Sequence, residues 1–98
     1  MTADQSRVIV YSSPFCGYCH AAKGLLERKG VVFEEVDVMF DRSKRDEMMA
    51  RSGRTTVPQV FVDGRHIGGY DDLNALELAG ELDAVLRMER GLNGLKDT

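Results

Sequence analysis

Residues 7–38 read RVIVYSSPFCGYCHAAKGLLERKGVVFEEVDV, and this pattern predicts a strand, a helix and a second strand. The first six residues are rich in β-branched and aromatic side chains, as in a largely buried strand, and Ser13-Pro14 ends it. Apolar residues then recur at helical spacing until Gly30 supplies a stop, and VVFEEVDV (31–38) is again a strand pattern. A strand–helix–strand unit of this length implies two parallel strands joined by a right-handed crossover.

Four more elements follow this unit, and they complete one mixed sheet. Their patterns lie at residues 41–52, 58–62, 65–69 and from 71 onward. Asp41 and Ser43 are candidate caps of the first of these helices, and Gly53 is its end. Asp63-Gly64 is typical of a two-residue hairpin turn, and Gly80 bends or divides the last helix. The order β-α-β-α-β-β-α predicts an α/β protein with a four-stranded mixed sheet flanked by helices, which is the thioredoxin-like arrangement.

The composition fits one small domain. The chain has 98 residues, 43% hydrophobic and 30% charged, so we expect one core over about residues 7–88 with flexible ends at 1–6 and 89–98. The net charge of -3 argues against a nucleic-acid partner, which favours a basic face. No apolar run approaches the length of a membrane span, and the polar N-terminus is unlike a secretory signal, so we expect a cytoplasmic location and no membrane partner.

The stretch FCGYCH (residues 15–20) fits three chemistries. C-x-x-C-H is the attachment pattern of a c-type haem, C-x-x-C is half of many zinc sites, and C-x-x-C beside a βαβ pattern is a thiol–disulfide redox motif. A haem needs a pocket and an export route, which this small sheet pattern does not suggest. Cys16, Cys19 and His20 lie too close together to complete a zinc tetrahedron, and His66 is the one other histidine. The strand–helix context therefore favours redox chemistry.

The positions of the two cysteines predict different roles. Cys16 stands where the chain leaves a strand and enters a helix, and the unpaired N–H groups of a helix start stabilise a thiolate. Cys19 lies three residues on, on the same helix face and about one turn deeper. The pair is near enough to form a disulfide with modest adjustment. We expect Cys16 to be the exposed attacking thiol and Cys19 the buried resolving thiol.

Two distant segments carry further signals. Pro58 in TTVPQVF (55–61) begins a strand, a position that tolerates the missing N–H donor of proline. GGYDDL (68–73) ends a strand and opens a helix, so its glycines allow close backbone approach and its helix start offers N–H groups to an anion. Taken alone, Pro58 only starts a strand, and Asp71 and Asp72 only cap a helix.

Taken together, these motifs resemble a family. YSSPFCGYCHAAKGLL (11–26) and RSGRTTVPQVFVDGRHIGGYDDL (51–73) are similar to the glutaredoxins, most closely the short bacterial dithiol type. The resemblance runs from about Val8 to Leu86. C-x-x-C, T-V-P and G-G-x-D-D-L in this order are far more specific than C-x-x-C alone, and thioredoxins typically carry a Trp before the first cysteine, whereas this chain has no Trp.

The resemblance implies a glutathione site. In such proteins the proline of T-V-P, here Pro58, is cis and faces the first cysteine. The backbone of Val57 would pair with the cysteinyl part of glutathione, and Tyr18 would form one wall. Asp71 or Asp72 would meet the ammonium group of the γ-glutamyl end. The full set of implied glutathione-binding residues is Tyr18, Thr56, Val57, Pro58, Gly69, Tyr70, Asp71 and Asp72.

Three residues depart from the family pattern. Ser13 stands where the family usually has a lysine that reaches the glycyl carboxylate, and Arg51 or Arg54 is the candidate substitute. Tyr70 stands where a small residue is usual, so it narrows the groove or stacks over it. Gly17 replaces the usual proline inside C-x-x-C.

The resemblance implies a glutathione-dependent thiol–disulfide oxidoreductase that reduces protein disulfides and protein–glutathione mixed disulfides through Cys16 and Cys19. Glutathione is then the co-substrate, and disulfide-bearing proteins, ribonucleotide reductase among them, are the expected partners of a monomer. The alternative is a dimeric [2Fe–2S] carrier or sensor, with Cys16 and glutathione as ligands. Some glutaredoxins without the inner proline bind such a cluster, and Gly17 raises that question here.

Overall fold

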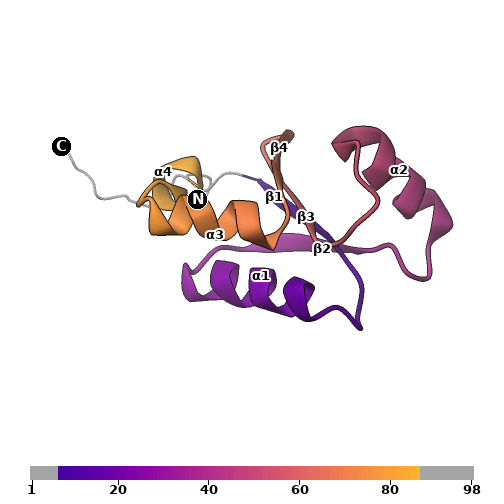
Figure 1. The fold of residues 1–98 in the computed structure, drawn as a ribbon, viewed down its shortest axis with the longest axis horizontal. Coiled ribbons are helices and arrows are strands. Elements are labelled where there is room, and N and C mark those ends of the chain that lie inside the picture. The colour runs from indigo at the N-terminus through magenta and orange to yellow at the C-terminus, as the bar shows by residue number, and fades with distance from the viewer. Residues whose placement is uncertain (1–6, 87–98) are drawn as a thin grey trace.

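In the computed structural model, residues 7–86 are described, and they form a four-stranded sheet flanked by helices (Figure 1). The observed order of elements is the predicted one, and of the two outcomes expected at Gly80, the division of the last helix is observed. The elements are β1 (Val8–Ser12), α1 (Gly17–Arg28), β2 (Phe33–Asp37), α2 (Arg42–Ser52), β3 (Gln59–Val62), β4 (Arg65–Gly68), α3 (Tyr70–Leu78) and α4 (Leu82–Leu86).

The strand order in the sheet is β2-β1-β3-β4, so β1 and β3 are the two central strands. β1 pairs with β2 in parallel, whereas β1 with β3 and β3 with β4 are antiparallel. The predicted mixed sheet is therefore confirmed. Because β1 and β3 run in opposite directions, the end of β1 lies beside the start of β3, where Tyr11 pairs with Gln59.

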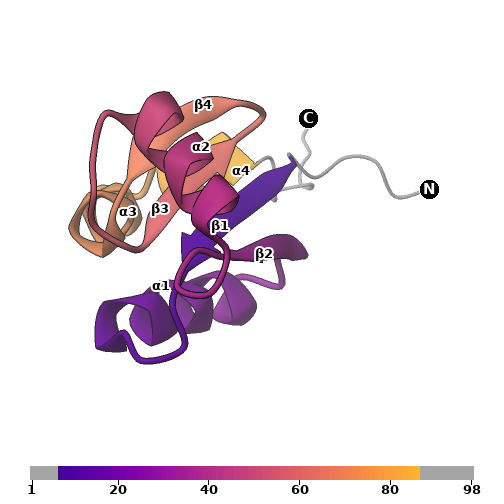
Figure 2. The same cartoon turned by 90° about the vertical axis from the view of Figure 1, so that its right-hand side faces the viewer.

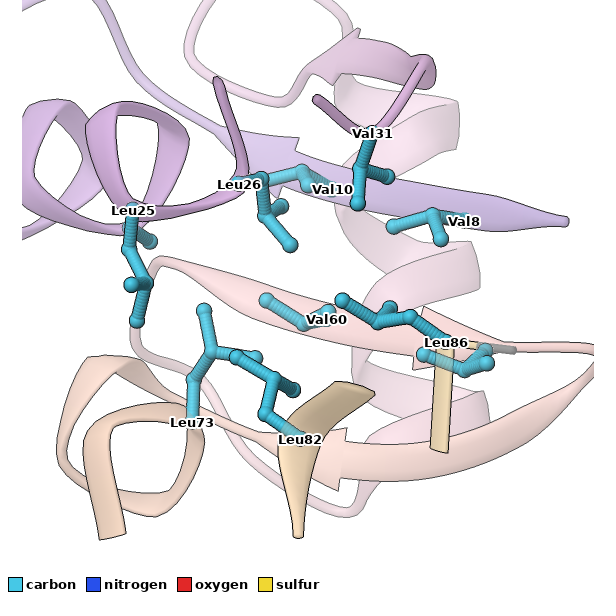
Figure 3. Close-up of a cluster of buried hydrophobic side chains, with 11 residues drawn as sticks. Val8, Val10, Leu25, Leu26, Val31, Val60, Leu73, Leu82 and Leu86 are labelled. Atoms are coloured by element: carbon cyan, nitrogen blue, oxygen red, sulfur yellow. The ribbon is translucent and has the colours of Figure 1, made fainter. Parts of the chain in front are cut away.

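Alternate residues of β1 face opposite sides of the sheet, which is the strand periodicity of two. Val8 and Val10 pack into the larger core cluster with side chains of α1, α3 and α4 (Figure 3). Tyr11 belongs to a second cluster, with Phe61 of β3 and Met48 of α2. Figure 2 shows α2 on one side of β1 and α1 on the other. The helices thus cover both faces.

The observed bounds of the second strand and of the last helix differ from the predicted ones. The second strand was expected over 31–38, but β2 is shorter, and the flanking Val31 is buried in the core instead. Gly80 adopts a left-handed conformation, with φ 76°, which favours glycine and separates α3 from α4. Asp63 and Gly64 both have positive φ, as the predicted tight hairpin turn requires. The expected core residues 87–88 and both expected flexible ends lie outside the described residues.

None of the helices within residues 7–86 has both the length and the apolar character that crossing a bilayer requires. The loops that carry the sequence motifs meet at one end of the sheet. Four segments come together there: the end of β1, the start of α1, the segment before β3 and the start of α3.

Candidate active site

Cys16 is the N-cap of α1. Its backbone is extended, and its Sγ accepts a hydrogen bond of 3.2 Å from the backbone N–H of Cys19. Cys16 is partly exposed, and its neighbours Pro14, Phe15 and Gly17 are exposed. A sulfur that accepts from an N–H at a helix start is stabilised as a thiolate. The predicted attacking position of Cys16 thus has the required local geometry.

Cys19 is fully buried, and both cysteines are free thiols. Burial raises the pKa of the Cys19 thiol to about 12, and its contact with the Cys16 side chain acts in the same direction. Because a thiol with so high a pKa stays protonated near neutral pH, Cys19 is a poor first nucleophile. The two thiols are therefore differentiated by depth along one helix turn, as the spacing predicted.

The segment before β3 faces Cys16 from the other half of the chain. The thiol of Cys16 lies 3.6 Å from the carbonyl oxygen of Val57, 41 positions later in the sequence. The peptide bond between Val57 and Pro58 is cis, as the family resemblance implied. The T-V-P motif and the C-x-x-C motif are thus neighbours in space.

A groove of about 340 Å³ opens next to Val57, whose carbonyl the Cys16 thiol contacts, and Cys16 itself is not among the lining residues. It runs between the start of α1, the T-V-P segment and the start of α3. All eight residues that the resemblance assigned to glutathione line this groove, together with Arg54, and the full lining is Tyr18, Arg54, Thr56, Val57, Pro58, Gly69, Tyr70, Asp71 and Asp72.

Two aromatic rings form one wall of this groove. The rings of Tyr18 and Tyr70 are stacked, with centroids 6.2 Å apart and an interplanar angle of 26°. Tyr70 is partly buried and packs against the main core cluster, whereas Tyr18 is 65% exposed. The anchored ring therefore supports the exposed one, and this stacking of Tyr70 on Tyr18 is a contact that the sequence did not predict.

Opposite charges meet at the start of α3. The carboxylate of Asp72 accepts a 3.0 Å hydrogen bond from the Gly69 N–H and lies 3.1 Å from the guanidinium of Arg54. These two partners hold the pKa of the Asp72 carboxyl below its usual range, the Gly69 amide most strongly. A Cβ at Gly68 would collide with this carboxylate, which explains the glycine there. Asp71 is exposed, and no described residue pairs with its carboxylate.

One of the two arginines suggested as a substitute for the missing lysine lies elsewhere. The guanidinium of Arg51 sits 4.3 Å above the Phe61 ring and donates to the Tyr11 hydroxyl at 2.7 Å, on the face of the sheet that α2 covers. Arg51 is therefore not a groove residue, because its side chain is used in packing α2 onto the sheet. Arg54 does line the groove, and Ser13 is buried.

The histidines take no part in a metal cluster. Within residues 7–86, no group of three or more His, Cys, Asp and Glu side chains is arranged to hold a metal ion. His20 is exposed, with its ring 3.4 Å from the Pro14 carbonyl, and His66 contacts the Gln59 side chain. His20 is thus a polar residue on the outer side of α1. The contacts of the two histidines give no support to the zinc and haem interpretations of FCGYCH.

A family model described as glutaredoxin matches residues 8–67. The chain belongs to the glutaredoxin family. Glutaredoxin 3 of Escherichia coli is 52% identical over 82 residues, which covers 84% of this chain and 99% of that protein.

Solved structures of glutaredoxins share the fold. A buckwheat glutaredoxin–glutathione complex superposes with a TM-score of 0.76 at 28% identity, covering 83% of this chain and 76% of that one. A structure described as metal binding of glutaredoxins superposes with a TM-score of 0.68 at 48% identity, covering 87% and 92%. Family and fold together make this glutaredoxin a thiol–disulfide oxidoreductase with a Cys16/Cys19 dithiol pair on a thioredoxin-like fold.

We expect the two thiols to differ sharply in alkylation. Iodoacetamide should modify Cys16 and leave Cys19 unmodified from about pH 6 to about pH 9, because Cys19 is buried and its pKa is about 12. Fragment-ion mass spectrometry of the labelled peptide distinguishes the two sites. The denatured protein is the control, in which both thiols should react. Equal labelling of both thiols in the folded protein would contradict the assignment.

Proposed function

We propose that this glutaredoxin uses glutathione to reduce protein–glutathione mixed disulfides and protein disulfides. The observation that carries the proposal is the 340 Å³ groove next to Val57, which is lined by every residue that the family resemblance assigned to glutathione. The groove joins the T-V-P segment, whose Val57 carbonyl contacts the Cys16 thiol, to the start of α3.

The first reaction needs Cys16 alone. The Cys16 thiolate attacks the glutathionyl sulfur of a mixed disulfide, so the protein sulfur leaves as a thiolate and takes up a proton. A second glutathione, as its thiolate, then attacks the glutathionyl sulfur held on Cys16. Oxidised glutathione leaves and the Cys16 thiolate returns. The incoming glutathione is oxidised and the protein sulfur is reduced to a thiol, while the transferred glutathionyl sulfur stays in a disulfide throughout.

The second reaction needs both thiols. Cys16 attacks a protein disulfide and forms a mixed disulfide with the client. Cys19 loses its proton as it attacks the Cys16 sulfur, and the client leaves as a dithiol. Two glutathiones then reduce the Cys16–Cys19 disulfide. The high pKa of Cys19 suits this order, because a protonated Cys19 cannot compete with Cys16 for the first attack.

The groove supplies partners for the charged ends of glutathione. The backbone N–H groups at the start of α3 suit the γ-glutamyl carboxylate. Asp71, whose carboxylate has no partner among the described residues, suits the γ-glutamyl ammonium group. Arg54 takes the role of the usual lysine towards the glycyl carboxylate, although it must share its guanidinium with Asp72. The Val57 backbone would align the cysteinyl part against Cys16.

Client proteins are those with accessible disulfides or glutathionylated thiols, and ribonucleotide reductase is the family client that the sequence suggested. We place these reactions in the cytoplasm, where the glutathione pool keeps thiols reduced. A monomer suffices for both reactions, since one chain supplies Cys16, Cys19 and the whole groove.

A [2Fe–2S] cluster is a second candidate function, and Gly17 is the observation that favours it. A Cβ built at Gly17 meets no atom within 4 Å, so the first turn of α1 is open beside Cys16. A similar structure is described as metal binding of glutaredoxins. One exposed Cys16 from each of two chains, with two glutathione thiolates, would supply the four sulfur ligands that such a cluster takes.

The thiol roles are tested by the pair Cys16→Ser and Cys19→Ser. On a small glutathione mixed disulfide, Cys16→Ser should fall to the uncatalysed rate, and Cys19→Ser should stay within about threefold of the unsubstituted protein. On a protein disulfide, both variants should lose activity, because Cys19 is needed to release the client. If both variants lost their activity on the small mixed disulfide, the route that needs Cys16 alone would be excluded.

The groove is tested by Asp71→Asn and Arg54→Gln. Each removes one charge that we assign to a glutathione end, so the KM for a glutathione mixed disulfide should rise roughly fivefold with kcat little changed. Asp46→Asn is the matched control, because Asp46 is an exposed carboxylate on α2 outside the groove. An unchanged KM in both groove variants would show that glutathione binds elsewhere.

The cluster hypothesis has a separate readout. Anaerobic reconstitution with iron, sulfide and glutathione should give visible iron–sulfur absorbance and a dimer by gel filtration. The Cys16→Ser variant should stay colourless, and Cys19→Ser should still bind the cluster, since Cys19 is buried. A colourless monomer of the unsubstituted protein under these conditions would count against a cluster.

A further inference from the structure

The segment that faces Cys16 is held in an unusual way. Residues 53–58 connect α2 to β3 and present the Val57 carbonyl to the Cys16 thiol. Within the described part of the chain, no backbone–backbone hydrogen bond outside the helices and strands involves residues 54–58. Side chains hold it instead, through contacts of Ser52, Arg45 and Gln59 with the carbonyls of Arg54, Thr55 and Thr56 respectively.

Gln59 is the buried member of this set, with 1% of its surface exposed. Its amide nitrogen donates to the Thr56 carbonyl at 3.0 Å and to the Thr56 hydroxyl at 3.3 Å. Its amide oxygen lies 2.7 Å from Nε2 of His66 on β4. A buried amide needs partners at both ends, and here both ends are satisfied.

The chemistry fixes the direction of these hydrogen bonds. The Thr56 carbonyl only accepts, so the amino group of Gln59 must face it and the amide oxygen must face His66. His66 must then carry its proton on Nε2 and donate it. The chain of donors runs from the His66 ring through the Gln59 amide to the Thr56 backbone, one residue before Val57.

His66 is itself fixed in place. Its ring packs on the Phe61 ring with centroids 5.0 Å apart. Burial lowers the pKa of His66, the Arg54 charge acts in the same direction, and Asp72 opposes them. The ring is therefore neutral at neutral pH, with one donor, which Gln59 uses.

We propose that Gln59 and His66 are positioning residues, which fix the Thr56–Pro58 backbone and so set the affinity of the groove for glutathione. Without the Gln59 donor, the Thr56 carbonyl loses the one hydrogen bond that the described residues give it and the following peptide can turn. The Val57 backbone would then no longer be aligned for the cysteinyl part of glutathione. This inference rests on the proposed function of the groove and names the residues that shape it.

The test uses S-methylglutathione, which cannot react, as a competitor of a glutathione mixed disulfide. Gln59→Met keeps the side-chain length and removes all three side-chain hydrogen bonds of Gln59. The inhibition constant and the KM of this variant should rise about fivefold, with kcat within about twofold. His66→Phe keeps the ring packing on Phe61 and removes only the donor, and its effect should be smaller and in the same direction. His66→Gln restores an N–H donor and should recover most of the affinity.

Val60→Ala is the control for a general loss of stability. Val60 is fully buried in the same strand and makes no side-chain hydrogen bond to the segment, so its variant should bind S-methylglutathione like the unsubstituted protein. An effect of Val60→Ala as large as that of Gln59→Met, or unchanged affinity in both Gln59→Met and His66→Phe, would overturn the proposal. No binding or turnover by the unsubstituted protein would instead contradict the proposed function itself.

Discussion

The pairing of β1 with β3 is the constraint on which the site depends. β1 leads into the C-x-x-C turn and β3 follows the T-V-P segment, and the antiparallel register sets Tyr11 opposite Gln59. That register brings the end of one strand to the start of the other, so the Cys16 thiol meets the Val57 carbonyl. Both strands are buried on both faces, between α1 with α3 on one side and α2 on the other. A slip by one residue would exchange these faces, which makes the register costly to change.

Near the groove, a few polar side chains each contact two polar partners. Asp72 accepts from the Gly69 N–H and pairs with Arg54. Gln59 joins the Thr56 backbone to His66. Buried or half-buried groups of this kind stabilise one conformation because an unpaired alternative is unfavourable. Asp71 also lines the groove, and its carboxylate has no partner among the described residues.

The sequence predicted the features of the fold that depend on neighbouring residues. It did not predict the features that depend on contacts between distant segments. The turn at Asp63-Gly64, the helix end at Gly53 and the start of α1 after Cys16 were all indicated by residues within a few positions. The sequence left Arg51 and Arg54 open as groove residues, because both precede the same segment. Only the packing of α2 directs Arg51 onto Phe61 and leaves Arg54 in the groove. The joint role of Gln59 and His66 had no sequence signal, since it depends on a hairpin contact between side chains.

The sequence by itself determined the elements, the order of the motifs and the different depths of Cys16 and Cys19, because helix starts, tight turns and strand periodicity are local properties of the chain. The tertiary structure decided which residues share one groove. Cys16 and Val57 are separated by 41 positions in the sequence. Tyr18 of α1 stacks on Tyr70 of α3, with three strands and a helix between them in the chain. Such neighbours are set by strand pairing and helix packing, which bury apolar area over the whole domain and are not encoded in any one segment.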